Sequence, residues 1–474
     1  MPQPFTRAQR AVTWVLASFL LVLAAAIGGA ILAPVFPGPL LAHSAPDPSV
    51  PAWLKAPSSP AVLRGATSLA DSAPTPAPAA LAKAIDAQLG PDNGTFGAVV
   101  LDGATGQSLY SRAGAQPVAP ASNLKLLTAA AVLRTLGPNA TLTTRTVRGS
   151  TPNSIVLIAG GDVFLGKGES QPDAVEGHAG LATLARATAA ALGPVHGTVS
   201  VQLDDSLFTG PALNPAWAAE DVAAGEIAPI APIALNVGRT QPGGSGSRPA
   251  DPALAAAAAF REALAAALGS DATIATGVAR TTASGAAELA SVASASVADQ
   301  LAYTLRESDN YSAETLARLA AAATGRPASI DGARAALEDT AQRVLGSTSG
   351  IDLRDASGLA ISDRIPAASL ASLMRAMTAG DDARLRRALD GLPVAGLTGT
   401  LAARYGQGSA GAGFVRAKTG TLNTVVGLTG YVVDAEGRLL VFSFVGNGLA
   451  PAARPSAAAA VDGAASVLAG CGCR

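Results

Sequence analysis

Cysteine, histidine and lysine are scarce in this chain of 474 residues. It holds two cysteines, three histidines and five lysines, whereas 28 of its 33 basic residues are arginines. Cys471 and Cys473 are separated by one residue, a spacing at which a mutual disulfide is strained and which alone makes a poor metal site. We expect an unstructured tail there, in preference to an intermolecular disulfide or lipidation, and we expect no metal or organic cofactor.

The chain also lacks an excess of charge of one sign. Its 33 basic and 34 acidic residues leave a formal net charge of −1, without the basic surplus that binding to a phosphate backbone requires. Nucleic acid is therefore excluded as a partner. Hydrophobic residues make up 49% of the chain, which is long enough for two or three domains of about 150 residues each.

One uncharged hydrophobic run stands near the N-terminus. Residues 11–36 carry no charge and follow Arg7 and Arg10, and a helix of that length exceeds the roughly 30 Å of bilayer hydrocarbon. We expect a cytoplasmic tail (1–10), a transmembrane anchor (11–36) and an extracytoplasmic remainder, because the basic residues lie upstream. The alternative is a protein secreted after signal cleavage near "LAHSA" (41–45). Residues 37–78 are rich in Pro, Ala and Ser and predict an extended linker.

The two ends of the remaining chain predict one α+β domain. Short loops between strands favour antiparallel neighbours, so the two regions are expected to share a five-stranded antiparallel sheet flanked by helices. The discontinuous domain covers residues 79–138 and 296–470, and an inserted β-rich domain with an alanine-rich helix (251–268) covers residues 139–295. The predicted elements of the sheet domain are helices at 79–90 and 454–469 and strands at 96–102, 108–112, 414–420, 425–434 and 438–447.

A serine and a lysine stand three residues apart in "ASNLKLL" (121–127). Ser122 opens an apolar pattern that predicts a helix, and residues three apart on a helix share a face, so Lys125 points towards the Ser122 hydroxyl. The simpler interpretation is that Ser122 caps the helix and Lys125 is solvated. A cation in the first turn, however, opposes the helix dipole.

A catalytic base explains why this position holds lysine in an arginine-rich chain. A serine hydroxyl becomes a good nucleophile only when a neighbouring base takes its proton. Burial beside another cation lowers the pKa of a lysine, whereas an arginine keeps its proton. Two further motifs provide that cation and a proton relay: Lys418-Thr419-Gly420 on a predicted strand, and Ser308-Asp309-Asn310.

In this order, S-x-x-K, S-D-N and K-T-G resemble the motif set of the penicillin-recognising serine enzymes, the D,D-peptidases and serine β-lactamases. The resemblance implies that Ser122 is acylated with Lys125 as its proton acceptor, and that Ser308 relays a proton to the leaving group. It also implies that Asn310 binds the substrate backbone. Lys418 with Thr419 would receive the terminal carboxylate, and Thr419, Gly420 and Thr421 are the expected substrate-binding residues. Backbone N–H groups of Ser122 and Thr421 would form the oxyanion hole.

The spacing of the three motifs along the chain narrows the resemblance to one group of these enzymes. The long separation between Lys125 and Ser308 exceeds what a compact β-lactamase needs and accommodates the inserted domain. With "LIAGGD" (157–162), "DASGLA" (355–360) and "LPVAGLTGTLAAR" (392–404), the chain is similar to the low-molecular-mass class C penicillin-binding proteins of peptidase family S13. This implies a serine D-Ala-D-Ala carboxypeptidase, with endopeptidase activity as a further expectation, that acts on peptidoglycan stem peptides and is inhibited by β-lactams. "DASG" departs from the D-G-S-G that members often have.

Other interpretations have less support. A Ser-His-Asp hydrolase or a histidine metal site would need a histidine near the motifs, but His43, His178 and His196 lie elsewhere. "LIAGGD" lacks the lysine of a phosphate-binding loop. A serine β-lactamase and a non-catalytic penicillin or peptidoglycan sensor share the motifs and stay as alternatives.

Overall fold

The structure is a computed structural model of the chain. It describes residues 69, 72–90, 94–244, 246–283, 285, 287–406 and 408–473. The predicted cytoplasmic tail and membrane anchor (residues 1–36) lie outside these residues, as does most of the linker. Within the described part of the chain, no helix is long and apolar enough to cross a membrane. The anchor at residues 11–36 stays a prediction.

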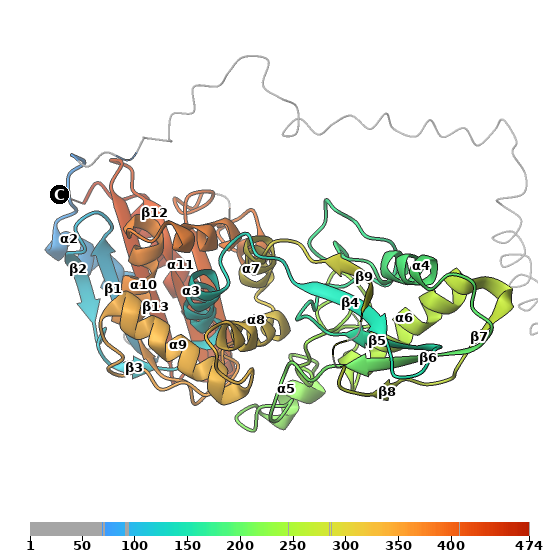
Figure 1. Ribbon diagram of the computed structural model, residues 1–474. Coiled ribbons are helices and arrows are strands. Elements are labelled where there is room, and N and C mark those ends of the chain that lie inside the picture. Colours follow the sequence, from blue (N-terminus) through green and yellow to red (C-terminus); the bar gives the residue numbers. More distant parts are fainter. Residues whose placement is uncertain are drawn as a thin grey trace, which may run out of the picture. The chain divides into compact units, whose positions relative to one another are not determined.

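Five antiparallel strands from both ends of the chain form the central sheet (Figure 1). Their order is β11-β12-β13-β1-β2, and β1 pairs with β13 from Thr95 opposite Asn447 to Asp102 opposite Leu440. The predicted sheet shared by the two terminal regions is confirmed. Its strands are β1 (Thr95–Asp102), β2 (Ser108–Arg112), β11 (Arg416–Leu422), β12 (Val425–Val433) and β13 (Leu439–Asn447).

Alternation along the strands gives the sheet two apolar faces. On β13, Phe442 and Phe444 pack in one core with helices α2 (Pro78–Leu89) and α11 (Arg454–Ala469). Val441 and Val445 point the other way, into a core with α3 (Lys125–Thr135) and α10 (Ala367–Ala379). Because successive strand residues face opposite sides, one strand supplies both cores. The predicted α+β class with helices on both faces is confirmed.

A helical region surrounds α3 on the second face of the sheet. The side chains of α3 are buried from Lys125 to Leu133, so its alanines and leucines pack against neighbouring elements on all faces of the helix. α3 packs against α8 and α9. The other helices of this region are α7 (Val297–Glu307), α8 (Asn310–Ala323), α9 (Ile330–Leu345) and the 3₁₀ helices η3 (Ala121–Leu124) and η5 (Ala383–Gly391). The remaining short elements are the two-stranded pair β3 (Pro117–Val118) and β10 (Ile365–Pro366), η6 (Gly399–Leu401), and η7 (Pro451–Ala453), which contacts α11.

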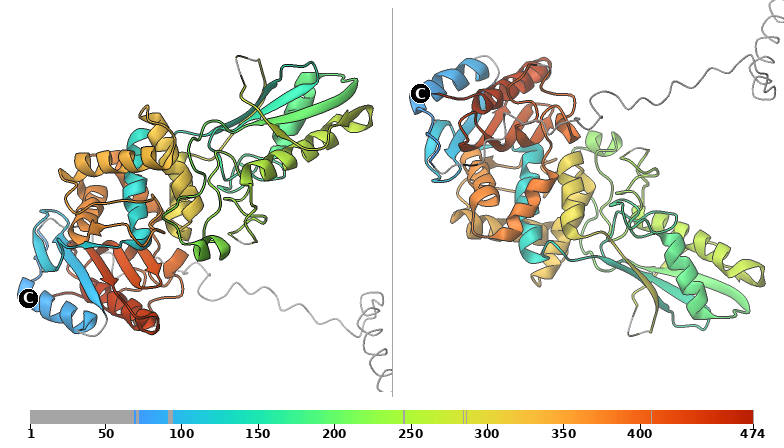
Figure 2. Two further views of the ribbon diagram at one scale, coloured as in Figure 1. Left: turned by 90° about the horizontal axis from the view of Figure 1, so that it is seen from below. Right: turned by 90° about the horizontal axis from the view of Figure 1, so that it is seen from above.

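The chain between α3 and α7 forms a second sheet with its own core (Figure 2). The strand order is β7-β6-β5-β4-β9, with β8 also paired to β6, and the pairs of β6 with β5, β7 and β8 are parallel. Helices α4 and α6 pack together against this sheet. The elements are β4 (Thr143–Arg148), β5 (Ser154–Ile158), α4 (Leu181–Leu192), β6 (Gly197–Asp204), α5 (Ala219–Ala223), α6 (Pro252–Leu268), η4 (Gly269–Asp271), β7 (Ala272–Ile274), β8 (Ala279–Arg280) and β9 (Glu288–Ala293).

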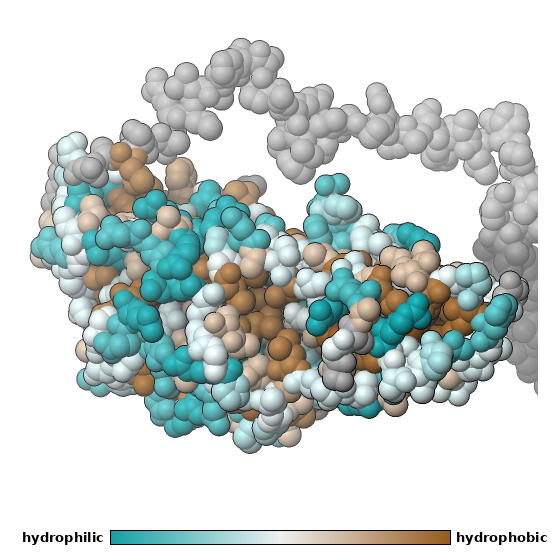
Figure 3. Space-filling view, in the orientation of Figure 1, coloured by the Kyte–Doolittle hydropathy of each residue, from teal (hydrophilic) through white to brown (hydrophobic). Residues whose placement is uncertain are grey.

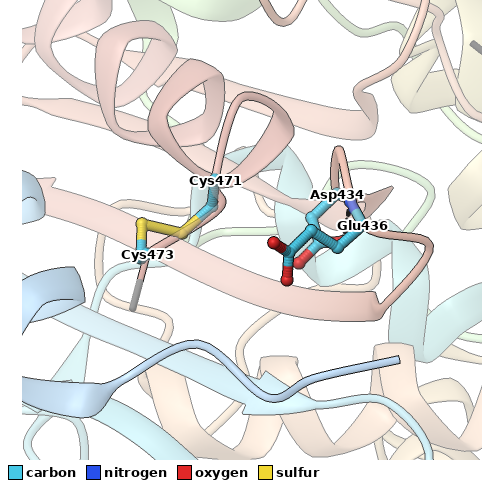
Figure 4. Close-up of a disulfide and its surroundings, with 4 residues drawn as sticks. All are labelled: Asp434, Glu436, Cys471 and Cys473. Carbon is cyan, nitrogen blue, oxygen red and sulfur yellow. Dashed lines mark hydrogen bonds between the residues drawn. A yellow bond between two sulfur atoms is a disulfide. The ribbon is translucent and has the colours of Figure 1, made fainter. Parts of the chain in front are cut away.

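The C-terminal "CGC" is ordered, contrary to the expected unstructured tail. Cys471 and Cys473 form a disulfide directly after α11, next to the turn that carries Asp434 and Glu436 (Figure 4). Cys471 is buried in the core shared by α2 and α11, and the Cys473 carbonyl accepts a hydrogen bond of 2.7 Å from the Ala77 N–H. The prediction was wrong because the spacing alone did not show that α11 would bury Cys471 and bring its end to the start of α2.

Polar side chains cover much of the face of the molecule shown in Figure 3. Hydrophilic residues (teal) and residues of intermediate hydropathy (white) cover most of the face in Figure 3, with hydrophobic residues (brown) visible near its centre. Six large hydrophobic residues of the described chain are exposed, and single exposed residues of this kind are ordinary on the surface of a folded protein. They are Leu69, Leu207, Leu213, Ile361, Leu397 and Phe414.

Candidate active site

A cleft of about 1170 Å³ lies beside the edge strand β11. The central domain supplies most of its wall, and the inserted sequence supplies residues around α5, including Trp217 and Glu226. Five of the eight predicted site residues line it: Ser122, Ser308, Asn310, Thr419 and Thr421. The other three, Lys125, Lys418 and Gly420, are buried behind this lining.

Local helix geometry explains why the Ser122 hydroxyl and the Lys125 amine meet. Ser122 lies in the 3₁₀ turn η3, and Lys125 ends that turn and begins α3. Side chains three apart in a 3₁₀ helix eclipse one another, more closely than in an α-helix. The Lys125 Nζ lies 2.9 Å from the Ser122 Oγ. Ser122 makes no capping hydrogen bond to either helix, so the simpler capping interpretation is wrong.

The Lys125 amine is enclosed by acceptors. It donates to Asn310 Oδ1 at 2.7 Å and to the Ser357 carbonyl at 2.8 Å, and the residue is 1% exposed. Burial lowers the pKa of Lys125 to about 8, against the opposing effect of four carboxylates. They are Asp355, Asp309, Glu314 and Glu226. A lysine whose pKa lies this close to neutrality can take a proton from Ser122.

The second amine, that of Lys418, lies across the site on β11. Its Nζ donates to the Ser308 Oγ at 2.8 Å and to the Thr419 carbonyl at 3.0 Å. Burial, together with the charge of Lys125, holds the pKa of Lys418 well below its usual value. The S-D-N and K-T-G motifs, 110 positions apart, are thus joined by one hydrogen bond.

The turn between α7 and α8 presents Ser308 and Asn310 to the cleft. Ser308 ends α7 in a left-handed conformation (φ 60°), which costs backbone energy for a residue other than glycine. Asp309 then caps α8 by accepting a hydrogen bond of 2.7 Å from the Ser312 N–H. Asn310 begins α8, and its Nδ2 donates to the Glu226 carbonyl at 3.1 Å, which leaves its Oδ1 for Lys125.

The remaining K-T-G residues have separate places. Thr419 and Thr421 line the cleft, and the Thr419 hydroxyl is 2.7 Å from the Thr400 hydroxyl. Gly420 is buried, and a Cβ there would lie 2.6 Å from Asn123 Nδ2 and 2.9 Å from the Pro120 carbonyl. Gly420 was predicted to bind substrate. The structure places it where β11 must approach η3 closely, and its part in substrate binding stays a prediction.

Gly427 on β12 faces the same amide even more closely. A Cβ at this position would lie 2.2 Å from Asn123 Nδ2. We expect Gly427→Ala to push η3 and its Ser122 away from the sheet, and so to slow acylation by penicillin about tenfold or more while destabilising the fold by ~1–3 kcal/mol. Stopped-flow acylation and thermal melting measure both effects. Gly406→Ala, at a glycine with open space around it, is the control and should change neither.

Several residues of the site were not predicted as site residues. Asp355 accepts hydrogen bonds from Trp217 Nε1 at 2.9 Å and from the Gly358 and Ala360 N–H groups at 2.7 and 2.8 Å. These bonds shape the loop whose Ser357 carbonyl binds Lys125. "DASGLA" was singled out as a motif and could have signalled this role. Nothing in the local sequence of Trp217 or Glu226 marks either residue.

The titration of Lys125 predicts the pH dependence of acylation. Only the neutral amine can accept the Ser122 proton, so the acylation rate should rise with pH through about 8 and level off above it. The charged groups facing this amine are Lys418 on β11, Asp309 at the N-cap of α8, Glu314 on α8, Asp355 in the loop after α9, and Glu226. Penicillin acylation measured from pH 6 to 10 tests this expectation, and a rate that falls over this range would contradict it.

A serine–lysine pair held between a five-stranded antiparallel sheet and a helical region defines the class of penicillin-recognising serine enzymes. Comparison with known proteins identifies the family. The sequence profile of the D-Ala-D-Ala carboxypeptidase 3 (S13) family matches residues 80–253 and 240–468, and the chain belongs to this family.

Two curated relatives cover most of the chain. It is 37% identical over 409 residues to carboxypeptidase DacB of Mycolicibacterium smegmatis, which covers 85% of this chain and 86% of that protein. It is 35% identical over 420 residues to carboxypeptidase Rv3627c of Mycobacterium tuberculosis, covering 86% and 88%. Penicillin binding protein 4 (dacB) of Haemophilus influenzae has the same fold, with a TM-score of 0.62 and 19% identity over 77% of this chain and 93% of that one. The predicted resemblance to family S13 is confirmed.

Proposed function

We propose that the chain is a serine D-Ala-D-Ala carboxypeptidase that trims peptidoglycan stem peptides through an acyl-enzyme. Membership of the D-Ala-D-Ala carboxypeptidase 3 (S13) family and the two carboxypeptidase relatives support this activity. The observation that carries it is the 2.9 Å contact between the Ser122 hydroxyl and an amine whose burial brings its pKa to about 8.

Acylation begins when Lys125 takes the Ser122 proton. The Ser122 Oγ then forms a bond to the carbonyl carbon of the penultimate D-alanine, and the developing oxyanion faces the backbone N–H groups of Ser122 and Thr421. As the peptide C–N bond breaks, the leaving amine takes a proton through Ser308, whose hydroxyl is held by Lys418. Water later cleaves the ester, which releases the shortened peptide and restores Ser122.

A β-lactam follows the first half of this course. Its ring carbonyl is attacked by Ser122 and the lactam C–N bond opens, but the amine stays attached to the acyl group and hinders the attack of water. The Haemophilus penicillin binding protein 4 has been solved in complex with a β-lactam, which supports placing such inhibitors in this cleft. Thr419 and Thr421 line the cleft, and we expect them to receive the carboxylate that β-lactams and D-alanine peptides share.

One experiment separates the carboxypeptidase from its alternatives. Purified protein is incubated with a muropeptide pentapeptide and, in parallel, with benzylpenicillin, and released D-alanine and intact penicillin are measured. The proposal expects D-alanine release that requires Ser122 and stops after acylation by penicillin. A sensor would release no D-alanine, and a β-lactamase would destroy penicillin faster than it released D-alanine.

The extent of the cleft favours endopeptidase activity as a second function. Besides Thr419 and Thr421, the cleft is lined by Arg454, Pro455 and Ala458 from the start of α11. This leaves room for a leaving group larger than a single D-alanine. A cross-linked muropeptide dimer should be cleaved to monomers, with loss in Ser122→Ala; an enzyme that trims pentapeptide but leaves the dimer intact would contradict this second function.

We further propose that residues 11–36 anchor an extracytoplasmic enzyme to the cytoplasmic membrane. The support is the uncharged run and the basic residues before it. The full chain should sediment with membranes, whereas a chain lacking residues 1–36 should not. Secretion after cleavage would instead yield a shortened protein that starts near residue 45.

A further inference from the structure

The inserted sequence makes several hydrogen bonds and ionic contacts with the S-D-N turn between α7 and α8. Three consecutive residues of the catalytic domain each contact the stretch of the insert from Gly225 to Arg248. Asn310 Nδ2 donates to the Glu226 carbonyl at 3.1 Å, and the Tyr311 hydroxyl donates to the Pro229 carbonyl and accepts from the Ala231 N–H, both at 3.2 Å. Asp309 faces Arg248, with 3.7 Å between Oδ2 and Nη2.

Arg248 is the centre of this contact. Its side chain is 4% exposed, and its Nε donates to the Gly225 carbonyl at 2.6 Å while its Nη1 donates to the Val237 carbonyl at 2.8 Å. Its Nη2 lies 3.4 Å from the Glu226 carbonyl, the same oxygen that Asn310 uses. The guanidinium also stacks on the Tyr311 ring, 5.7 Å from its centroid.

This geometry fixes which way the Asn310 amide faces. Asn310 has one carbonyl and one NH₂ group, and the proposed base, Lys125, needs the carbonyl at 2.7 Å. The NH₂ group stays on the opposite side because the Glu226 carbonyl accepts from it. If that carbonyl moves, the amide loses the bond that sets its orientation, and a turned amide would present N–H groups to the Lys125 ammonium.

We propose that Arg248 is a positioning residue of the reaction, which holds the Gly225–Glu226 carbonyls so that Asn310 orients the amine of Lys125. The inserted domain is therefore part of the catalytic machinery. The inference rests on the proposed serine–lysine chemistry. A planar fork of donors suits the role, because one arginine side chain reaches several carbonyls and the Asp309 carboxylate together.

The test measures penicillin acylation of wild type, Arg248→Gln and Arg248→Lys. We expect the acylation rate constant of Arg248→Gln to fall by about 10- to 100-fold, the usual range for outer partners of a site residue, while the number of sites that are finally acylated stays at one per chain. Arg248→Lys keeps a positive charge facing Asp309 but lacks the planar set of N–H donors of the guanidinium, so its acylation rate should lie between those of Arg248→Gln and wild type.

A second measurement separates positioning from a general contribution to folding. If Arg248 acts through Asn310, then Arg248→Gln should slow acylation by less than about threefold in a protein that already carries Asn310→Ala. Equal effects in both backgrounds would overturn the inference, as would a wild-type rate in Arg248→Gln. If Arg248→Gln left fewer than one acylated site per chain but those sites reacted at the wild-type rate, Arg248 would have a folding role. That outcome would also overturn the inference.

Arg280→Gln is the matched control. Arg280 is another arginine of the inserted domain, and it binds Asp205 and Asp251 at 2.8 and 2.9 Å with its side chain 45% exposed. Its acylation rate should equal that of wild type. Failure of wild type itself to be acylated would reject the proposed function, whereas an acylated wild type with an equally fast Arg248→Gln would reject only the inference.

Discussion

Replacing Lys125 by arginine should abolish measurable acylation of Ser122 while leaving the protein folded. The arginine keeps the positive charge and the hydrogen-bonding capacity, but it cannot release its proton at any pH the protein tolerates. Loss of a positioned base costs about 10²–10⁴-fold in rate. Because Lys125 Nζ donates to Ser122, Asn310 and Ser357 in the structure, a guanidinium can occupy the same acceptors and still leave the hydroxyl without a base.

Mass spectrometry of the intact protein after exposure to benzylpenicillin measures this result. Wild type should gain one adduct, located at Ser122 by peptide mapping, and Lys125→Arg should gain none over the same time. Lys167→Arg is the control, since Lys167 is 67% exposed and pairs with Glu262 at the surface. Cooperative melting of Lys125→Arg would show that its fold is retained. Acylation at the wild-type rate would refute the assigned role of Lys125.

The catalytic centre was predictable because its reactive residues lie in short sequence motifs. Ser122 and Lys125 are three residues apart, so one helical turn brings their side chains together. The strands at 96–102 and 438–447 are apolar, as is typical of strands that lie side by side in a buried sheet, and they do pair in the structure. The observed bounds, Thr95–Asp102 and Leu439–Asn447, differ from the predicted ones by one residue. Rare residue types helped, because a lysine in an arginine-rich chain marks a position where arginine fails.

The supports of the site were not predictable in this way. Glu226 contributes a backbone carbonyl, which any residue could supply, and Arg248 is one of 28 arginines with no motif around it. Both act through the folding of the inserted domain against α8, a contact between segments far apart in the chain. Gly420 shows the converse case, because a motif position that suggested substrate binding has a packing function that only the distance to Asn123 reveals.

The two amines of the site differ in their surroundings, and this difference assigns their roles. Four carboxylates oppose the loss of the Lys125 proton, whereas the charge of Lys125 promotes the loss of the Lys418 proton. In the part of the chain that the structure describes, neither hydrogen bond of Lys418 goes to a carboxylate. A substrate carboxylate arriving beside Thr419 would therefore be the anion that stabilises a charged Lys418.

Replacing Lys418 by alanine should for this reason reduce the turnover of peptides with a free C-terminal carboxylate more than that of other peptides. We expect kcat/KM for such a peptide to fall by about 10²-fold or more, since a charge-assisted contact and the bond that holds Ser308 are lost together. An analogue ending in an amide lacks the anion, so wild type should already turn it over slowly and Lys418→Ala should slow it much less. Steady-state D-alanine or D-alaninamide release measures both.

The matched control for this variant is Lys167→Ala. This change removes an exposed lysine and should leave the peptide preference in place. If Lys418→Ala slowed the acid and the amide equally, Lys418 would have no part in carboxylate recognition, and the carboxylate would have to be bound by Thr419 and Thr421 alone.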